Sequence, residues 1–211
     1  MELYFAPMAC SLATRIALYE TGQTATFVCV DRMEGKLEDG SDYHRVNPMG
    51  QVPALRTDSG ELLTETSAIL QYVADLDPEG RLAARSGPAR YRLQRWLNFI
   101  TSELHKALFY PQFSPASNDG AKAFARDLLE KRFDYLERHL TGREFLLDRF
   151  TVADAYLATV LGWTRPVGID LGRWPALKDY FDRMRARPAV ATAVAEEYAL
   201  YEAHEARKGA A

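Results

Sequence analysis

The sequence predicts an α/β domain followed by an all-helical domain. Over residues 1–75, short apolar strand patterns alternate with helical spacing in the order βαβαββα. A stretch with prolines and glycines follows at 76–88, and beyond it only helical spacing recurs. We therefore place the α/β domain at residues 1–78 and the all-helical domain at residues 88–201.

The first thirty residues predict a strand, a helix and a second strand. Residues 2–5 alternate like a short strand that Pro7 ends, and residues 10–20 have the apolar spacing of a helix that Gly22 closes. Residues 26–30 are apolar or β-branched throughout, which is typical of a strand buried on both faces in a parallel pair. Together these elements predict a right-handed crossover unit.

Two connections, a hairpin and a helix complete the first domain. Residues 31–40 are polar and contain glycine, so we expect a loop, which carries Lys36. Residues 42–46 predict one helical turn. Within residues 52–63 an Asp-Ser-Gly turn separates two short strands, and apolar spacing then predicts a helix that ends near Asp75.

The hairpin and its helix also have features that suit a peptide-like ligand. Pro53 lacks a ladder donor but leaves the N–H and C=O of Val52 able to pair with an extended molecule, whether or not the bond between them is cis. At the helix N-terminus, Glu65 offers a carboxylate for an ammonium group, and Thr66 offers a hydroxyl and free N–H groups for an anion. A γ-glutamyl group carries both charges. The alternative is that Glu65 and Thr66 only cap the helix.

The second domain is predicted from helical spacing alone. Thr151 and Asp154 form a capping box at the start of a strongly apolar helix, which suggests the centre of the domain. We expect a small, polar and frayed end at residues 202–211. Two further helices are expected over residues 93–108 and 124–140. Another is expected to begin at Trp174, and Pro188 separates it from the last one.

Composition excludes several classes of protein. The net charge is −3 and no basic cluster is present, which argues against nucleic-acid binding. No apolar run has membrane-spanning length and no secretory signal is recognisable, so we expect a cytoplasmic location. The two cysteines and four scattered histidines match neither a disulfide framework nor a metal site.

Cys10 is the candidate reactive residue. It lies where a loop meets the first helix, so the helix dipole and free N–H groups would lower its thiol pKa and enrich the thiolate. No second cysteine follows at C-x-x-C spacing, so we expect mixed disulfides with an external thiol. Ser11 could donate a hydrogen bond to a bound thiolate. Alternatively, Cys10 is a small loop residue without chemistry, and Cys29 is expected in the core.

Four motifs in order resemble the cytosolic glutathione S-transferases, most closely the bacterial beta class. They are Cys10-Ser11, the segment 51–55 (QVPAL), the segment 65–69 (ETSAI) and the capping box at Thr151. The resemblance covers nearly the whole chain. It implies a thioredoxin-like first domain, a helical second domain, a homodimer and glutathione as cosubstrate.

The resemblance also implies roles for individual residues of the first domain. Cys10 would lie beside the glutathione sulfur, Val52 would pair with the cysteinyl unit, and Glu65 and Thr66 would hold the γ-glutamyl end. Lys36 is a further candidate, although Gly35 stands one position earlier, where the beta class often has a basic residue. The partner of the glycine carboxylate therefore stays open.

In the second domain, the resemblance implies a contribution from one helix to the glutathione site. Catalytic roles are assigned to Cys10, Ser11 and His105. We expect Asn98, Ser102, His105 and Phe109 to form one stripe, since they follow helical spacing; an ordinary solvated helix face is the alternative. The glutathione-binding candidates of this domain are Asn98, Ser102, Glu103, His105 and Lys106, and the candidate walls for an electrophile are Met8, Phe109, Phe113 and Trp163.

The expected reaction is attack of an activated thiolate on an electrophilic small molecule, or on a disulfide that includes Cys10. Three alternatives remain. Arg15-Ile16-Ala17-Leu18 also suits the zeta class, whose members isomerise maleylacetoacetate-type substrates, but an arginine expected before it is absent. The other two are a non-catalytic docking protein of the same fold and a thiol reductase of the glutaredoxin type. The physiological electrophile and the reaction type stay open.

Overall fold

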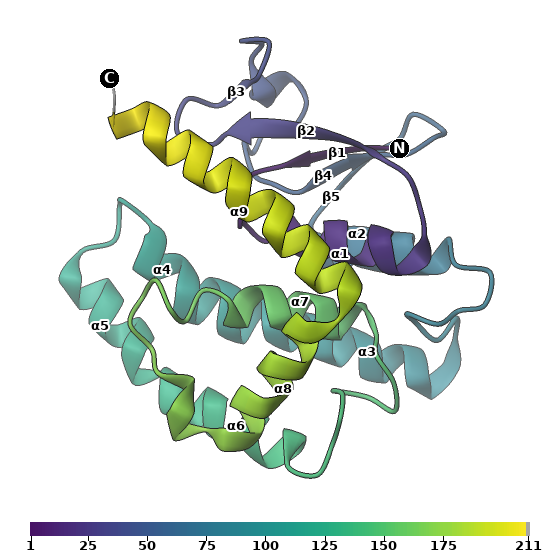
Figure 1. Ribbon diagram of the computed structural model, residues 1–211, viewed down its shortest axis with the longest axis vertical. Coiled ribbons are helices and arrows are strands. Elements are labelled where there is room, and N and C mark those ends of the chain that lie inside the picture. The colour runs from purple at the N-terminus through teal and green to yellow at the C-terminus, as the bar shows by residue number, and fades with distance from the viewer. Residues whose placement is uncertain (210–211) are drawn as a thin grey trace. The chain divides into compact units, whose positions relative to one another are not determined.

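The computed structural model describes residues 1–209, which divide into two compact units (Figure 1). One unit comprises Met1–Leu82 and the chain from Arg187 onward, and the other comprises Ala83–Ala186. The last helix, α9 (Pro188–Gly209), packs on α1 (Leu12–Thr21) of the first unit. The expected boundaries had instead assigned residues 188–201 to the helical domain.

The first unit is a thioredoxin-like fold built on one five-stranded sheet, in the order β3-β2-β1-β4-β5. The central strand β1 runs parallel to β2 and antiparallel to β4, and the other pairs are antiparallel. The strands are β1 (Glu2–Phe5), β2 (Thr26–Asp31), β3 (Lys36–Leu37), β4 (Ala54–Arg56) and β5 (Leu62–Thr64).

The sheet differs from expectation at its β3 edge. The expected loop at 31–40 contains the two-residue strand β3, because the chain turns back far enough to pair with the end of β2. The expected burial of β2 on both faces is wrong: within this strand only Val30 is buried, since the sole neighbour on its outer side is short. The expected helical turn is a 3₁₀ helix over Tyr43–Arg45.

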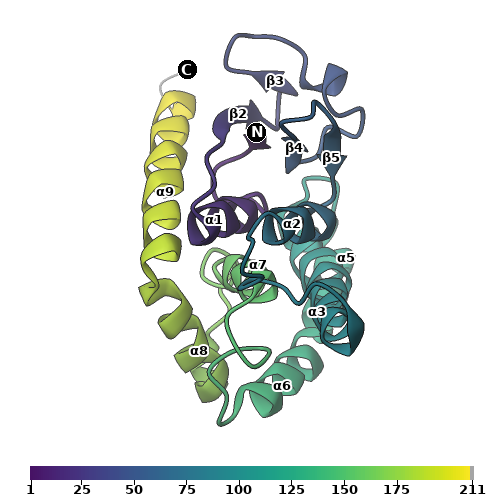
Figure 2. The same cartoon turned by 90° about the vertical axis from the view of Figure 1, so that its right-hand side faces the viewer.

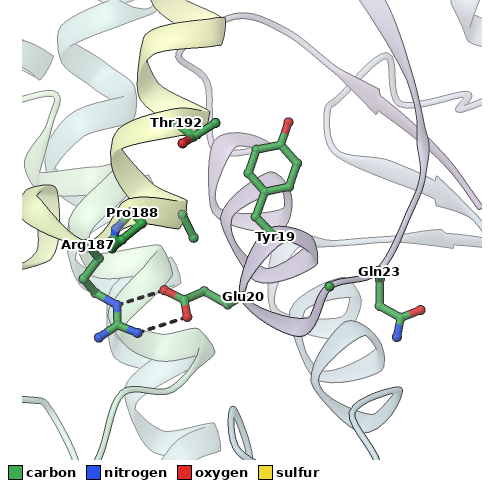
Figure 3. A pocket seen from close by; sticks show the side chains of 8 residues that line it. Tyr19, Glu20, Gln23, Arg187, Pro188 and Thr192 are labelled. Carbon is green, nitrogen blue, oxygen red and sulfur yellow. Dashed lines mark hydrogen bonds and ion pairs between the residues drawn. The ribbon is translucent and has the colours of Figure 1, made fainter.

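Three helices of the first unit lie side by side. Helix α1 ends at Gly22 in the left-handed conformation, as its position predicts, and α2 (Thr66–Asp75) and α9 both contact α1 (Figure 2). Where α9 begins, the Arg187 guanidinium donates two hydrogen bonds to the Glu20 carboxylate, at 2.8 and 3.0 Å, beside a cleft of about 580 Å³ (Figure 3).

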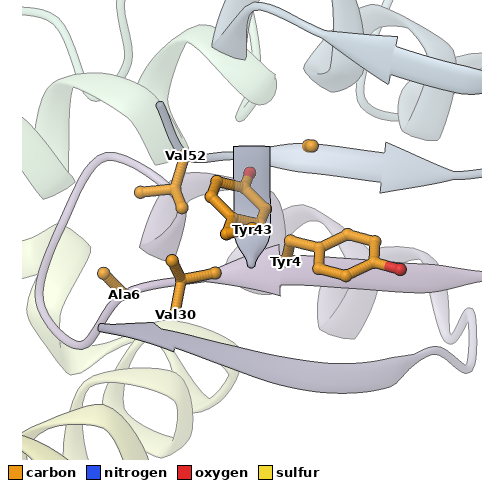
Figure 4. Packing of buried hydrophobic residues seen from close by; sticks show 6 residues of the cluster. Tyr4, Ala6, Val30, Tyr43 and Val52 are labelled. Carbon is orange, nitrogen blue, oxygen red and sulfur yellow. The ribbon is translucent and has the colours of Figure 1, made fainter. Parts of the chain in front are cut away.

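A group of buried side chains fills the first unit near the end of β1. Tyr43 is fully buried there and packs 5.8 Å from the Tyr4 ring, centroid to centroid. Val52 and Val30 close the same cluster from other segments (Figure 4). The loop that precedes β4 is therefore anchored by the core and not only by its own turn.

All regular elements of the second unit, within the described residues, are helices. Its centre is α7 (Val152–Leu161), where every side chain is buried and where the predicted capping box of Thr151 and Asp154 is formed. The other helices are α3 (Gly87–Phe99), a π-helix over Ile100–Phe109, α4 (Tyr110–Phe113), α5 (Asp119–Asp127), α6 (Leu129–Leu140), a 3₁₀ helix over Leu171–Arg173, and α8 (Pro175–Ala186).

Two expectations for the helices are wrong. The spacing over 124–140 suggested one apolar face, but the chain breaks at Leu128 into α5 and α6, and Phe124 is 66% exposed because each helix has its own phase. The expected frayed end is helical up to Gly209, helped by His204, whose Nε2 lies 3.7 Å from the Asp31 carboxylate. Residues 210–211 lie outside the described residues. Among residues 1–209, no helix combines the length and apolarity that a membrane crossing needs.

Candidate functional site

Cys10 lies at the start of α1, as its sequence position suggested. The residue is 7% exposed, and its carbonyl accepts a hydrogen bond from the backbone N–H of Ala13 in the first turn. Its thiol donates to the carbonyl oxygen of Val52 at 3.1 Å. Two residues that are 42 positions apart, both predicted for the site, are thus in direct contact.

The Ser11 hydroxyl forms hydrogen bonds within its own loop. Its hydroxyl is fully buried, donates to the Ala6 carbonyl at 3.2 Å and accepts from the Ala6 N–H at 3.3 Å. Both bonds close the loop between β1 and α1. A hydrogen bond from Ser11 to a bound thiolate would require the hydroxyl to leave the Ala6 carbonyl.

Val52 precedes β4 instead of opening it, and the bond between Val52 and Pro53 is cis. Since β4 pairs with both β1 and β5, Val52 does not lie along an edge of the sheet but beyond the last pair of an interior strand. Among the described residues, none accepts a hydrogen bond from the Val52 N–H. Its carbonyl has a second lone pair beside the one that Cys10 uses. Both backbone groups can therefore still pair with an extended ligand.

Tyr43 and Asn47 hold the loop that leads to Val52, and sequence reasoning did not find either. The Tyr43 hydroxyl and the Asn47 side-chain amide both donate to the carbonyl of Gln51, at 2.8 and 2.7 Å. Burial raises the pKa of Tyr43 to about 12, so the hydroxyl keeps its proton and acts as a donor. The sequence offered only the pair Asn47-Pro48 as a signal, and a polar residue before a proline is common in loops.

Glu65 and Thr66 lie at the N-terminus of α2. Glu65 is the N-cap residue, yet its side chain makes no capping hydrogen bond, and its backbone has a left-handed φ of 65°. Thr66 is buried. The exposed carboxylate of Glu65 and the first N–H groups of α2 are therefore adjacent, which suits a group that carries both an ammonium and a carboxylate. The interpretation of Glu65 as a capping side chain is not supported.

Lys36 begins β3 and is exposed, with its ammonium 3.3 Å from the Glu34 carboxylate. The neighbouring Gly35 has a φ of 67°, and a Cβ there would come within 2.7 Å of the His44 ring. The local backbone therefore favours glycine at the position where the beta class often has a basic residue.

In the second unit, the four residues expected to form one helical stripe differ in how deeply they are buried. Asn98 and Ser102 are exposed, His105 is half-buried and Phe109 is fully buried. The π-helix is the reason, because its i→i+5 bonding adds a residue to each turn and rotates Phe109 away from the face on which Asn98 lies. Spacing that assumes an α-helix cannot anticipate this rotation.

Two other predicted residues of this unit have partners inside it. The Glu103 carboxylate pairs with the Arg132 guanidinium, which also donates to the Glu103 carbonyl at 3.1 Å. Lys106 is exposed, with its ammonium 5.0 Å from the centre of the Tyr110 ring. Both contacts stabilise the helical unit.

His105 belongs to an aromatic cluster centred on Trp163. Its Nδ1 lies 2.7 Å from the Tyr156 hydroxyl, and its ring centre lies 4.9 Å from that of Trp163. Phe109 and Phe113 also contact Trp163, at 5.8 and 6.1 Å between ring centres. The structure thus brings together three of the four residues predicted as a wall, whereas Met8 belongs to the other unit.

Sequence reasoning also missed Arg15 and Glu197. The Arg15 side chain lies over the rings of Phe5 and Phe27, and its Nε donates to the Glu197 carboxylate at 3.0 Å. Glu197 also accepts the N–H of Met8 at 2.8 Å. These residues are up to 189 positions apart, so local pattern could not connect them. No group of three or more potential metal ligands occurs within residues 1–209.

Comparison with known proteins identifies the family. A model of the glutathione S-transferase N-terminal domain matches residues 7–76, and a model of its C-terminal domain matches residues 100–188. The glutathione S-transferase GstA of Escherichia coli is 44% identical over 199 residues, which cover 93% of this chain and 98% of that protein.

Two solved structures agree, each with a TM-score of 0.89 and with 93% of this chain and 98% of the other chain covered. One is a sphingomonad glutathione S-transferase complexed with glutathione, at 47% identity. The other is a bacterial beta-class glutathione S-transferase of Sphingomonas chungbukensis, at 46% identity. The chain therefore belongs to the glutathione S-transferase family and resembles its bacterial beta class.

Proposed function

We propose that this glutathione S-transferase holds glutathione with its thiol beside Cys10 and directs the thiolate to electrophilic small molecules. The observation that carries the proposal is the contact of the Cys10 sulfur with the Val52 carbonyl, at 3.1 Å. The contact places the Cys10 sulfur at the start of α1 and beside the Val52 backbone groups that would pair with the cysteinyl unit of glutathione.

The first unit would bind glutathione at two points. The N–H and C=O of Val52 would pair with the cysteinyl unit, and Glu65 with the N-terminus of α2 would hold the ammonium and carboxylate of the γ-glutamyl end. Lys36 remains a candidate for the glycine carboxylate. Residues of the second unit are proposed from the family resemblance alone: Asn98, Ser102, Glu103, His105 and Lys106.

The proposed chemistry is nucleophilic substitution. The glutathione sulfur forms a bond to an electrophilic carbon, the leaving group departs with its electron pair, and the thiol proton goes to solvent. Phe109, Phe113 and Trp163, together with Met8, are proposed to orient the electrophile. Phe109 is fully buried, so its contribution would be to hold the Trp163 ring.

Thiol transfer through Cys10 is a second candidate activity. Cys10 and Cys29 are the two cysteines of the sequence, and no second cysteine lies close to Cys10 in sequence to resolve a disulfide. A mixed disulfide on Cys10 would therefore be cleaved by a glutathione thiolate, which bonds to one sulfur while the other leaves as a thiolate.

Replacement of Cys10 tests both activities. We expect Cys10→Ala to lower conjugation of a chlorodinitrobenzene by about tenfold or more and to abolish glutathione-dependent disulfide reduction, while calorimetric glutathione binding persists. Cys29→Ala is the matched control and should keep both activities. Unchanged conjugation and unchanged disulfide reduction in Cys10→Ala would show that the catalytic assignment is wrong.

Family membership supports two further proposals, a homodimer and a cytoplasmic location. Light scattering during gel filtration would check the first, with a mass near twice the 23.8 kDa of one chain expected. Fractionation of the source cell would check the second.

A further inference from the structure

Glu197 is a fully buried carboxylate on α9, close to the loop that carries Cys10. Its Oε1 accepts from the Arg15 Nε at 3.0 Å, and its Oε2 accepts from the backbone N–H of Met8 at 2.8 Å. Neither matched family segment, 7–76 or 100–188, includes it. A buried charge that bonds a loop backbone calls for a role beyond packing.

The loop that Glu197 contacts has a strained backbone. Met8 has a φ of 60°, in the left-handed region that side-chain-bearing residues rarely adopt. Met8 lies two residues before Cys10, and on the other side of the loop Ser11 is bonded to Ala6. The Met8 conformation therefore sets the direction in which the chain enters Cys10.

Arg15 fixes the Glu197 carboxylate in place. Its guanidinium lies 3.8 Å from the centre of the Phe27 ring and 4.5 Å from that of Phe5, and Nη1 donates to Glu196 at 3.0 Å. Because the guanidinium is held on two sides, the carboxylate oxygen that faces Met8 has little freedom.

We propose that Glu197 is a positioning residue for Cys10: its carboxylate holds Met8 in the left-handed conformation and so keeps the Cys10 sulfur at the Val52 carbonyl. The inference rests on the proposed function, because the proposed function is what gives Cys10 a role in the reaction. It assigns to α9, which lies beyond the matched helical segment except for Pro188, a direct part in shaping the thiol site of the first unit.

Glu197→Gln tests the proposal, because glutamine keeps the size of the side chain but cannot offer two anionic oxygens. The readout is the rate at which iodoacetamide alkylates Cys10 as a function of pH, in a Cys29→Ala background with one thiol. We expect the midpoint of the profile to move and the alkylation rate at neutral pH to change by about tenfold. Glu202→Gln is the matched control, since Glu202 is an exposed carboxylate on the same helix, and its profile should not move.

A second variant decides the matter if Glu197→Gln alone does not fold. Glycine adopts a positive φ without strain, so Met8→Gly combined with Glu197→Gln should restore both folding and the original alkylation profile. A folded Glu197→Gln protein with an unmoved profile, or a folded double variant with a displaced one, would overturn the proposal. This readout measures the reactivity of the Cys10 thiol and not the enzyme's activity. The positioning role of Glu197 can therefore be disproved while the Cys10→Ala test supports the proposed function, and the proposed function can be disproved while the positioning role holds.

Discussion

At the scale of single residues, two strained backbone conformations lie at the proposed site. Among the described residues, Met8 and Glu65 are the two that combine a side chain with a positive φ. Such conformations cost on the order of 1–3 kcal/mol each and persist only where surrounding contacts hold them. Met8 precedes Cys10, and Glu65 begins α2, so the strain falls at the points where the thiol and the γ-glutamyl end would be held.

The buried Glu197 carboxyl makes the free energy of unfolding depend on pH. Burial, partly offset by Arg15 and by the Met8 N–H, raises its pKa from 4.5 to about 7. Arg15, Glu196 and Tyr19 are the ionisable groups grouped around this contact. Because the folded protein binds the proton more tightly than the unfolded chain, this contribution to stability is complete below pH 4.5 and is lost as the pH rises through about 7.

This predicts how Glu197→Gln changes the free energy of unfolding. The difference between 4.5 and about 7 corresponds to roughly 3 kcal/mol, so the stability of the wild-type protein relative to the variant should fall by that amount from about pH 4 to about pH 8. Urea denaturation at several pH values measures it. Glu202→Gln, which removes an exposed carboxylate on the same helix, should follow the wild-type curve, and parallel curves for the wild-type protein and Glu197→Gln would contradict the prediction.

At the scale of elements, the start of α7 depends on one carboxylate. Asp154 is fully buried and accepts four hydrogen bonds, from the N–H and hydroxyl of Thr151, the N–H of Leu146 and the hydroxyl of Tyr180, at 2.9 to 3.0 Å. These bonds link the cap of α7 to the preceding loop and to α8. Helix α7 is buried along its whole length, so its start affects the centre of the unit.

We expect Asp154→Ala to lower the free energy of unfolding by about 3 kcal/mol or more, because it leaves buried donors without an acceptor. Urea denaturation of the purified variant measures the loss. Asp179→Ala, an exposed aspartate on α8, should change stability by less than about 0.5 kcal/mol. Equal effects of the two substitutions would show that the capping box does not stabilise α7.

At the scale of the whole molecule, ligand binding should couple to folding. A ligand that binds only the folded protein stabilises it by about 2.7 kcal/mol when its concentration is one hundred times the dissociation constant. We therefore expect glutathione to raise the denaturation midpoint by an amount that grows with the logarithm of its concentration once this concentration exceeds the dissociation constant. Cysteinylglycine, which lacks the γ-glutamyl end, should have little effect because Glu65 and the N-terminus of α2 would have no partner. An equal shift with both ligands would contradict the proposed role of α2.

Local pattern was sufficient for a large part of this protein. The hairpin before α2, the left-handed end of α1 at Gly22, the capping box at Thr151 and the helix that starts at Pro175 were all predicted from short-range spacing. Each depends on residues within a few positions of one another, and the physical cause is local hydrogen bonding and periodicity. The order of four such motifs was also enough to indicate the family.

Other features were decided only by the tertiary structure. The packing of α9 on α1, the bond from Met8 to Glu197 and the contact of Cys10 with Val52 all join residues far apart in sequence. The spacing within one segment does not say which distant segment packs against it, so local pattern could not connect these residues. Sequence alone therefore determined which chemical groups the protein has and where its capped elements lie, such as the end of α1 and the start of α7, and tertiary packing determined which of those groups meet.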